Sequence, residues 1–358
     1  MNVFYFNPDN DLAIANGGEY YTPTPIAEQL RRDLQLLPCW LADDGDCVLC
    51  DSNKWQQWVE NKGLKVKLIT KNDLSVLDNV TFRPWGWNPA IRKQLITWGA
   101  NEDLLPSKSN IEHIRKLAHR RTTIDIHRRL TEITGITFCP SPVELDDIEL
   151  IKDFALQHPG CYAKEPWSGS GRGVYRALDP NGRDFIQRCQ GALNRQGSML
   201  CEVPFERTLD FAVEMECNHG MTTITGYSIF ESDFHLQYKS GIVKPRTELR
   251  SIITMQYPDF HIVEDSIIKI IDEIVQPHFK GFLGVDMLLF HMPEGNVGIN
   301  PCVELNMRTT MGAVTAALGE RHGMNGKFSI CPVEKIEADD ILLTPVDIST
   351  KFAAIIKQ

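Results

Sequence analysis

The chain has 358 residues, with 37 lysines and arginines against 47 aspartates and glutamates, so its formal net charge is −10. This acidic balance argues against a protein dedicated to binding nucleic acid or an anionic membrane surface. Hydrophobic residues make up 42% of the chain and charged residues 23%, a composition that excludes disorder along the whole chain. A chain of this length is expected to fold into more than one domain.

The sequence predicts a cytoplasmic protein without a membrane-spanning segment. No run approaches about 18 apolar residues, and the first residues are too short a stretch, and too uncharged, for a signal peptide. The ten cysteines are scattered, and only Cys47 and Cys50 have a spacing that is also found in redox and zinc sites. Because this pair lies in an apolar run and no second pair follows, we interpret both as small buried side chains.

Short apolar runs alternate with amphipathic stretches in the N-terminal part of the chain. The apolar runs predict strands at residues 3–6, 47–50, 65–69 and 80–83. The amphipathic stretches predict helices at residues 25–37, 55–61 and 89–98. This alternation indicates a parallel sheet covered by helices. Ligands of such sheets gather at the carboxyl ends of the strands, which is where the loops at residues 7–11 and 84–89 fall.

A different pattern begins near residue 106. Ser109 is placed to cap a long helix whose charged side carries Arg115, Arg120 and Arg129. A strand is predicted at residues 136–140, and two further helices are predicted at residues 184–193 and 266–279. The chain shows no internal repeat and no long linker, so we expect tightly packed lobes.

The most informative segment joins a lysine to a glycine-rich loop. Residues 162–164 are strand-like and end at Lys164, and the loop that follows contains Ser168, Gly169, Ser170, Gly171 and Gly173. The backbone N–H groups of such a loop can approach phosphate oxygens. The pattern predicts a strand, a flap and a return strand, and a glycine-rich hairpin that binds nothing is the alternative.

Three better-known phosphate-binding patterns do not match this segment. A Walker loop ends in Gly-Lys-Ser/Thr, and a Rossmann loop opens a helix, whereas Gly173 is followed by the strand-like residues 174–177. In a protein kinase the lysine follows the glycine loop, but Lys164 precedes this one.

A second constellation combines acids and an amide on two predicted strands. Asp286 interrupts the apolar strand predicted at residues 284–290, and residues 298–308 form the other strand. Residues two apart on a strand share a face, so Glu304, Asn306 and Arg308 project together. A cation would offset the burial of the Asp286 carboxylate, and such oxygen ligands suit Mg²⁺ bound with phosphates. An ordinary salt bridge or a hydrogen-bonded pair is the alternative.

Together and in this order, the two constellations resemble the ATP-grasp superfamily over residues 106–320. The resemblance implies an α/β fold, in which ATP-grasp lobes follow an N-terminal Rossmann-like domain with a parallel sheet. It implies an N-terminal α/β domain at residues 1–105 and a small lobe with the flap at residues 106–200. A large lobe with the metal site would span residues 201–330, and a C-terminal extension packed on the core would span residues 331–358.

The resemblance also implies roles for the matching residues. Asp286, Glu304 and Asn306 match the metal ligands, and Lys164 and Arg308 match the catalytic residues. A longer set of residues matches the family's nucleotide contacts: Arg120, Lys164, Ser168, Gly169, Ser170, Gly171, Gly173, the hinge residues Glu202, Val203, Pro204 and Phe205, and Asp210 at the ribose. Arg120 stands where the family usually has a second lysine, and arginine keeps the charge and can bind phosphate with two N–H groups.

The activity that the resemblance implies is an ADP-forming ligation that uses ATP and Mg²⁺. A small-molecule carboxylate is activated as an acylphosphate and is then joined to an amine; no nucleic-acid or membrane partner is expected. A homodimer would be the commonest assembly for a soluble enzyme. Two other functions stay open: an ATP-binding module that senses nucleotide or acts as a scaffold without turnover, and phosphoryl transfer to a hydroxyl acceptor on the same fold.

Overall fold

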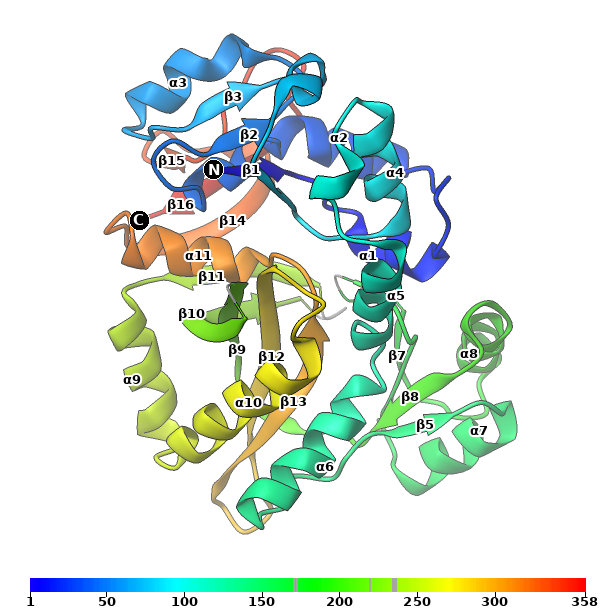
Figure 1. Cartoon of the computed structure of the whole chain (residues 1–358). Helices are drawn as coiled ribbons and strands as arrows, with labels where there is room; N and C mark the ends of the chain where they lie inside the picture. Colours follow the sequence, from blue (N-terminus) through cyan, green and yellow to red (C-terminus); the bar gives the residue numbers. More distant parts are fainter. Residues whose placement is uncertain (170, 172, 219, 234–236) are drawn as a thin grey trace.

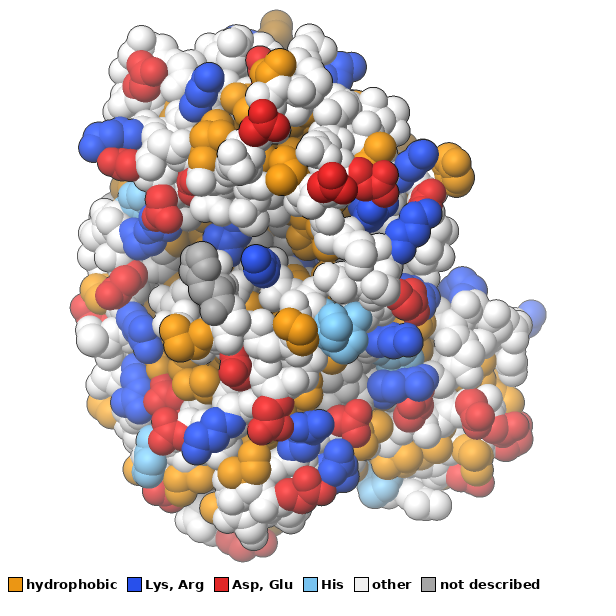
Figure 2. Space-filling model, viewed as in Figure 1, with side chains coloured by type: hydrophobic (Ala, Val, Ile, Leu, Met, Phe, Trp, Pro, Cys, Tyr) orange, Lys and Arg blue, Asp and Glu red, His pale blue; other side chains and the backbone are white. Residues whose placement is uncertain are grey.

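A computed structural model of the chain describes residues 1–169, 171, 173–218, 220–233 and 237–358. Within these residues the strands form one eight-stranded sheet and two four-stranded sheets, and helices cover their faces (Figure 1). None of the helices in this described part has the length and apolar character that a membrane crossing requires. On the face seen in Figure 2, basic side chains are interspersed with acidic ones.

The N-terminal part forms a parallel sheet, which confirms the predicted layer. The strand order is β3 (Lys67–Ile69), β2 (Cys47–Leu49), β1 (Asn2–Tyr5) and β4 (Thr81–Pro84). The helices that follow these strands or connect them are α1 (Asn10–Asn16), α2 (Pro25–Leu34), α3 (Gln56–Asn61) and α4 (Pro89–Thr97). β2 and β3 lie on one side of β1, and β4 lies on the other side. The order in which strands are added to the sheet therefore reverses between β1 and β4.

A small antiparallel sheet carries the glycine-rich flap. Its strand order is β5 (Val143–Leu145), β8 (Met199–Glu202), β6 (Tyr162–Lys164) and β7 (Val174–Arg176). The helices α7 (Ile148–Gln157) and α8 (Arg183–Gln196) share a buried core with this sheet, which includes Ala163, Cys189 and Cys201. The pairing of β6 with β7 on the two sides of the flap confirms the predicted strand, flap and return strand.

The eight-stranded sheet is antiparallel throughout its described pairs. Its strand order is β13 (Val297–Asn306), β12 (Gly281–His291), β9 (Glu206–Asn218), β10 (Met221–Ser232), β11 (Tyr238–Val243), β14 (Gly326–Pro332), β16 (Phe352–Lys357) and β15 (Ile341–Leu342). Buried residues of β9 and β12 share a core with α6 (Thr122–Thr134), α9 (Arg246–Gln256) and α10 (Phe260–Val275). The helix α11 (Met311–Glu320) belongs to another core, with the N-terminal part and β14 and β16.

The C-terminal strands connect the large sheet to the N-terminal part. The indole Nε1 of Trp40 donates a hydrogen bond to the carbonyl oxygen of Leu343, at 2.8 Å. The Asp33 carboxylate accepts hydrogen bonds from the backbone N–H groups of Lys351 and Phe352, at 2.9 and 3.0 Å. Residues at opposite ends of the chain therefore pack into one buried layer.

The structure corrects the long helix that was predicted after residue 106. The helix α5 (Lys108–Leu117) is capped by Ser107, not Ser109, because the Ser107 hydroxyl accepts a hydrogen bond from the N–H of Asn110 at 3.1 Å. The chain then turns at residues 118–121, where His119 Nδ1 accepts the N–H of Arg121 at 3.0 Å, before α6 begins. The basic run is therefore divided between two helices.

Other predicted elements are shifted or wrong. The described residues at 136–140 form no strand, because Pro140 and the nearby Pro142 lack the N–H groups that a strand ladder requires; β5 begins only after them. The helix predicted at residues 266–279 begins earlier, at Phe260, and ends at Val275 before a proline. The helix α9 was not predicted, although Leu249 and Ile253 have helical spacing and are buried.

Candidate functional site

A cleft of about 190 Å³ lies where the flap, the large sheet and the segment after β1 meet. Among the residues predicted from the sequence, six line it: Gly169, Gly171, Asp286, Glu304, Asn306 and Arg308. Asp11, from the loop predicted to lie at the carboxyl ends of the strands, also lines it, and the polar residues that were not predicted include Glu214, Ser228 and Thr310. Chain segments far apart in sequence thus contribute backbone N–H groups, carboxylates and a guanidinium to one cavity.

The acids on β12 and β13 are candidate ligands for a divalent cation. Asp286 and Glu304 are direct partners in the strand register, and Asn306 lies opposite Gly284 in the same ladder. Burial raises the pKa of Asp286 to about 8, with a further rise from the negative charge of Glu304, while a hydrogen bond from Asn306 opposes the rise. Two facing carboxylates with an amide are a hard oxygen set that fits Mg²⁺, because the cation removes their mutual repulsion.

Arg120 connects the flap to these acids. Its side chain is 4% exposed, and Nη2 donates to both carboxylate oxygens of Glu304 at 2.9 Å. Its Nη1 donates to the Ser168 hydroxyl at 2.5 Å and to the carbonyl oxygen of Glu165 at 2.7 Å. The Arg120 Nε is buried without a hydrogen-bond partner among the described residues. A guanidinium with an unused N–H therefore stands beside both the flap and the candidate cation site.

Lys164 lies in a second group of charges, outside the lining of the cleft. Its ammonium binds the Glu202 carboxylate at 2.6 Å, and both side chains are buried. Burial raises the pKa of Asp210, and attraction to Arg207 and Lys164 opposes that rise. The structure thus brings the predicted lysine, the hinge glutamate and the ribose acid into one neighbourhood.

Cys302 is a buried thiol on β13, two residues before Glu304. Burial raises the pKa of its thiol well above the usual value, with further rises from Asp286, Glu202 and Glu304 and an opposing effect of Lys164. The charges of both groups therefore act on this thiol.

The predicted hinge is the connection between the small sheet and the large sheet. β8 ends at Glu202 and β9 begins at Glu206, so Val203, Pro204 and Phe205 cross from one sheet to the other. The Phe205 ring packs on Phe290 of β12, with ring centroids 4.4 Å apart. This contact fixes the hinge beside the strand that carries Asp286.

The flap is held close to the N-terminal part. Gly173 has a φ of 71°, in the left-handed region that favours glycine, and its carbonyl accepts the N–H of Glu165 at 2.7 Å. A Cβ on Gly169 would overlap the Asp11 carboxylate, so only glycine allows this approach. Ser168 is bound by Arg120, whereas the predicted Ser170 lies outside the described residues.

Arg308 forms a bidentate ion pair that the sequence did not predict. Its Nε and Nη2 donate to the two carboxylate oxygens of Asp11, at 2.7 and 2.8 Å. The neighbouring Thr309 N–H donates to the carbonyl oxygen of Trp85 at 2.7 Å. The end of β13 is therefore fixed to both loops of the N-terminal sheet.

Glu214 is a further carboxylate that sequence reasoning missed. It is 1% exposed, and its oxygens accept hydrogen bonds from Ser228 at 3.0 Å and Thr310 at 2.7 Å. Burial raises its pKa to about 7. The signal in the sequence was a glutamate among the apolar residues 211–215, on the strand that follows the hinge.

Solved structures match the chain at the level of the fold. The biotin carboxylase from Campylobacter jejuni, in a β-γ-ATP complex, is 12% identical, with a TM-score of 0.55 over 99% of this chain and 86% of that chain. The N5-carboxyaminoimidazole synthetase from Staphylococcus aureus is 13% identical, with a TM-score of 0.50 over 99% of this chain and 92% of that chain. The chain has the ATP-grasp fold. Neither a protein-family model nor a curated protein sequence matches it.

The ATP-grasp fold agrees with the resemblance that the sequence motifs predicted. The flap glycines and the acids of the large sheet line the same cleft. The identities of 12 and 13% establish the fold and leave the reaction to be inferred from the site itself.

Proposed function

We propose that the protein is an ADP-forming ligase that uses ATP and Mg²⁺ to join a carboxylate to an amine. The observation that carries this proposal is the shared cleft of Gly169, Gly171, Asp286, Glu304 and Asn306. Such a cleft combines a phosphate-cradling backbone with ligands for a hard cation. The structural match to a carboxylase in complex with β-γ-ATP supports the presence of a nucleotide in the same kind of cleft.

The charges of the site are suited to phosphoryl transfer. Asp286, Glu304 and Asn306 would hold Mg²⁺, which supplies positive charge to the phosphate oxygens when it is bound. Lys164 and Arg120 bind the remaining phosphate oxygens. Arg120 must then exchange the Glu304 carboxylate for phosphate, which frees Glu304 to face the cation.

The proposed reaction balances in two steps. An oxygen of the substrate carboxylate bonds to the γ-phosphorus of ATP while the bond to the β-phosphate oxygen breaks, which releases ADP. The amine nitrogen then bonds to the acyl carbon of this acylphosphate, and phosphate leaves. Arg308 is placed to stabilise the negative charge of the acylphosphate, and flap closure excludes water that would hydrolyse it.

Glu214 is suited to accept the proton that the amine loses in the second step. It lines the cleft, and a carboxylate with a pKa of about 7 is matched to proton transfer near neutral pH. The hydrogen bonds from Ser228 and Thr310 fix the orientation of its carboxylate.

The test is ATP-dependent ADP release, screened over carboxylates combined with amines. We expect release with Mg²⁺, and its loss in Glu304→Gln with the melting temperature retained. The exposed Glu334 provides a matched control, because Glu334→Gln should leave release unchanged. Full activity of Glu304→Gln would contradict the metal assignment.

The same assay separates the alternatives. Nucleotide binding without ADP release for any acceptor pair would favour a sensing or scaffolding protein. Release that requires an alcohol, and yields a phosphate ester, would favour phosphoryl transfer to a hydroxyl.

A further inference from the structure

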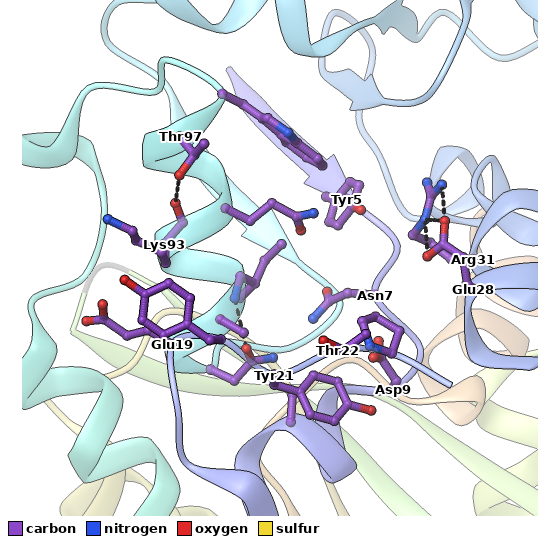
Figure 3. A pocket seen from close by; sticks show the side chains of 18 of the residues that line it. Tyr5, Asn7, Asp9, Glu19, Tyr21, Thr22, Glu28, Arg31, Lys93 and Thr97 are labelled. Atoms are coloured by element: carbon purple, nitrogen blue, oxygen red, sulfur yellow. Dashed lines mark hydrogen bonds and ion pairs between the residues drawn. The ribbon is translucent and has the colours of Figure 1, made fainter. Parts of the chain in front are cut away.

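A second cavity, of about 620 Å³, lies in the N-terminal domain, outside the cleft (Figure 3). Its walls come from the segment after β1, from residues 19–23 and from α4. β1 and β4 are neighbours in the sheet although β2 and β3 come between them in sequence. Such a switch point leaves a crevice at the carboxyl ends of the strands, where parallel sheets bind small molecules.

Tyr5 contributes a hydroxyl group to this cavity. Tyr5 ends β1, is 5% exposed, and packs edge-on against Trp98 with ring centroids 5.8 Å apart. In the described part of the chain its hydroxyl has no hydrogen-bond partner. Burial raises the pKa of Tyr5 to about 12, so the hydroxyl keeps its proton and can donate. A hydroxyl that faces a cavity and has no protein partner can donate to a bound polar group.

Several charged side chains of the wall are already paired. Arg31 binds Glu28 and Asp51, at 2.9 Å each, and Figure 3 shows the Glu28 contact. Glu19 binds Lys108 at 2.7 Å. These groups have little free charge to offer an occupant of the cavity.

Asp9 and Lys93 differ from the other charged groups of the wall. Within the described ranges, neither of them forms an ion pair. Burial raises the pKa of the Asp9 carboxyl, and a hydrogen bond with Tyr21 opposes the rise. In Figure 3, Lys93 stands on the left of the cavity and Asp9 on the right, below Asn7. The cavity therefore presents one anion and one cation at separate positions.

The segment after β1 borders both cavities. Asn7 and Asp9 line the N-terminal cavity, whereas Pro8 and Asp11 line the cleft. The Asn7 amide donates to the carbonyl oxygen of Gly86 at 2.8 Å, which fixes the start of this segment. A group bound at Asp9 is therefore separated from the cleft by the thickness of one chain segment.

We infer that the N-terminal cavity binds a zwitterionic amine, with its ammonium at Asp9, its carboxylate at Lys93 and a polar group at the Tyr5 hydroxyl. A free amino acid and a short peptide share this chemistry, and the experiment below distinguishes them. The inference goes beyond the proposed function, because a compound in this cavity lies outside the cleft and is not the amine that attacks the acylphosphate there.

The experiment measures binding to the full chain by calorimetry, without nucleotide. The probes are the twenty standard amino acids and sets of dipeptides and tripeptides built from them. We expect one of these classes to bind, and N-acetylation or C-terminal amidation of the bound compound to weaken its affinity about tenfold or more, since each removes a charge-assisted contact. Failure of every probe would overturn the inference.

Variants then locate the bound compound. Asp9→Asn and Lys93→Gln should each weaken binding about tenfold, and Tyr5→Phe about threefold, with melting temperatures that confirm folding. Glu304→Gln, in the cleft, should leave the affinity within about twofold. Binding that survives the first two changes, or that only Glu304→Gln removes, would place the compound elsewhere and overturn the inference.

Failure of the proposed function gives a different result. If a compound binds through Asp9 and Lys93 while no pair of carboxylate and amine yields ADP, the cavity assignment stands and the ligase is contradicted. ADP release from a pair of carboxylate and amine, in a protein that binds none of the probes at Asp9 and Lys93, would support the ligase and contradict the inference.

Discussion

Single residues of the cleft show how strand register brings the proposed cation ligands together. Like charges directly opposite each other in a sheet are destabilising, yet Asp286 and Glu304 hold these positions. In the structure the positive charge of the Arg120 guanidinium offsets the negative charge of Glu304. The site is therefore arranged to exchange one positive group for another as ligands enter.

Lys164 supports a prediction about nucleotide affinity. Lys164→Ala should weaken the binding of a non-hydrolysable ATP analogue, on the order of 1.5–3 kcal/mol, because a charge-assisted contact to phosphate is lost. Calorimetry measures this, with circular dichroism to confirm folding, because Glu202 loses its partner. The exposed Lys71 offers a control, and an equal effect of Lys71→Ala would show that general charge is responsible.

Glu214 supports a prediction about pH. Its folded-state pKa of about 7 lies above the ordinary value of 4.5. A raised pKa contributes stability below the unfolded-state value, and that contribution is lost as the pH rises through 7. Glu214→Gln stays neutral, so between about pH 5 and pH 8 it should gain unfolding free energy relative to the wild type, on the order of 2 kcal/mol. Urea unfolding at both pH values measures this, and parallel curves for the two proteins would show that Glu214 titrates normally.

At the scale of elements, the sequence predicted the helices and strands that show a clear local pattern of apolar residues or glycines. The apolar runs of β1 and β12 and the glycine-rich turn between β6 and β7 are local patterns, and the structure contains them. The break between α5 and α6 was missed, because it depends on His119 accepting the N–H of Arg121, a contact that no apolar period reveals. Pro140 and Pro142 gave a readable signal against the strand predicted beside them.

The contact between α11 and β9 supports a prediction about packing. A Cβ on Gly312 would overlap Glu214 Oε1 and the Ser228 hydroxyl. Gly312→Ala should therefore lower the free energy of unfolding by about 1–3 kcal/mol, as overpacked cores do. In a Glu214→Ala background the same change should cost less, because its main neighbour is gone. Equal losses in both backgrounds, measured by urea unfolding, would contradict this contact.

At the scale of the whole molecule, the contacts that assemble the cleft could not be predicted from local pattern. Arg120 and Glu304 are 184 residues apart, and Arg308 and Asp11 are 297 residues apart. The motifs pointed to Asp286, Glu304 and Asn306 because acids and an amide on apolar strands are unusual, and the three residues line one cleft. Asp11 lies in a loop that the strand pattern had placed at the carboxyl edge of the sheet, but its pairing with an arginine depends on the fold.

The ion pair between Asp11 and Arg308 supports a prediction about how the domains hold together. Asp11→Ala leaves a largely buried guanidinium without its partner, so unfolding free energy should fall by on the order of 3 kcal/mol. Asp44, which is exposed and pairs with Lys65, is the control, and Asp44→Ala should cost less than about 1 kcal/mol. Similar losses in the two variants would show that Asp11 contributes no more than a surface charge.

The hydrogen bond between Trp40 and Leu343 has a consequence for biosynthesis. The two residues are separated by 303 positions, so the tryptophan leaves the ribosome long before its partner is made. A nascent chain that is still incomplete exposes this indole and the apolar side chains around it, which makes it a substrate for chaperones and prone to aggregation. Translation of the final strands ends that vulnerable interval.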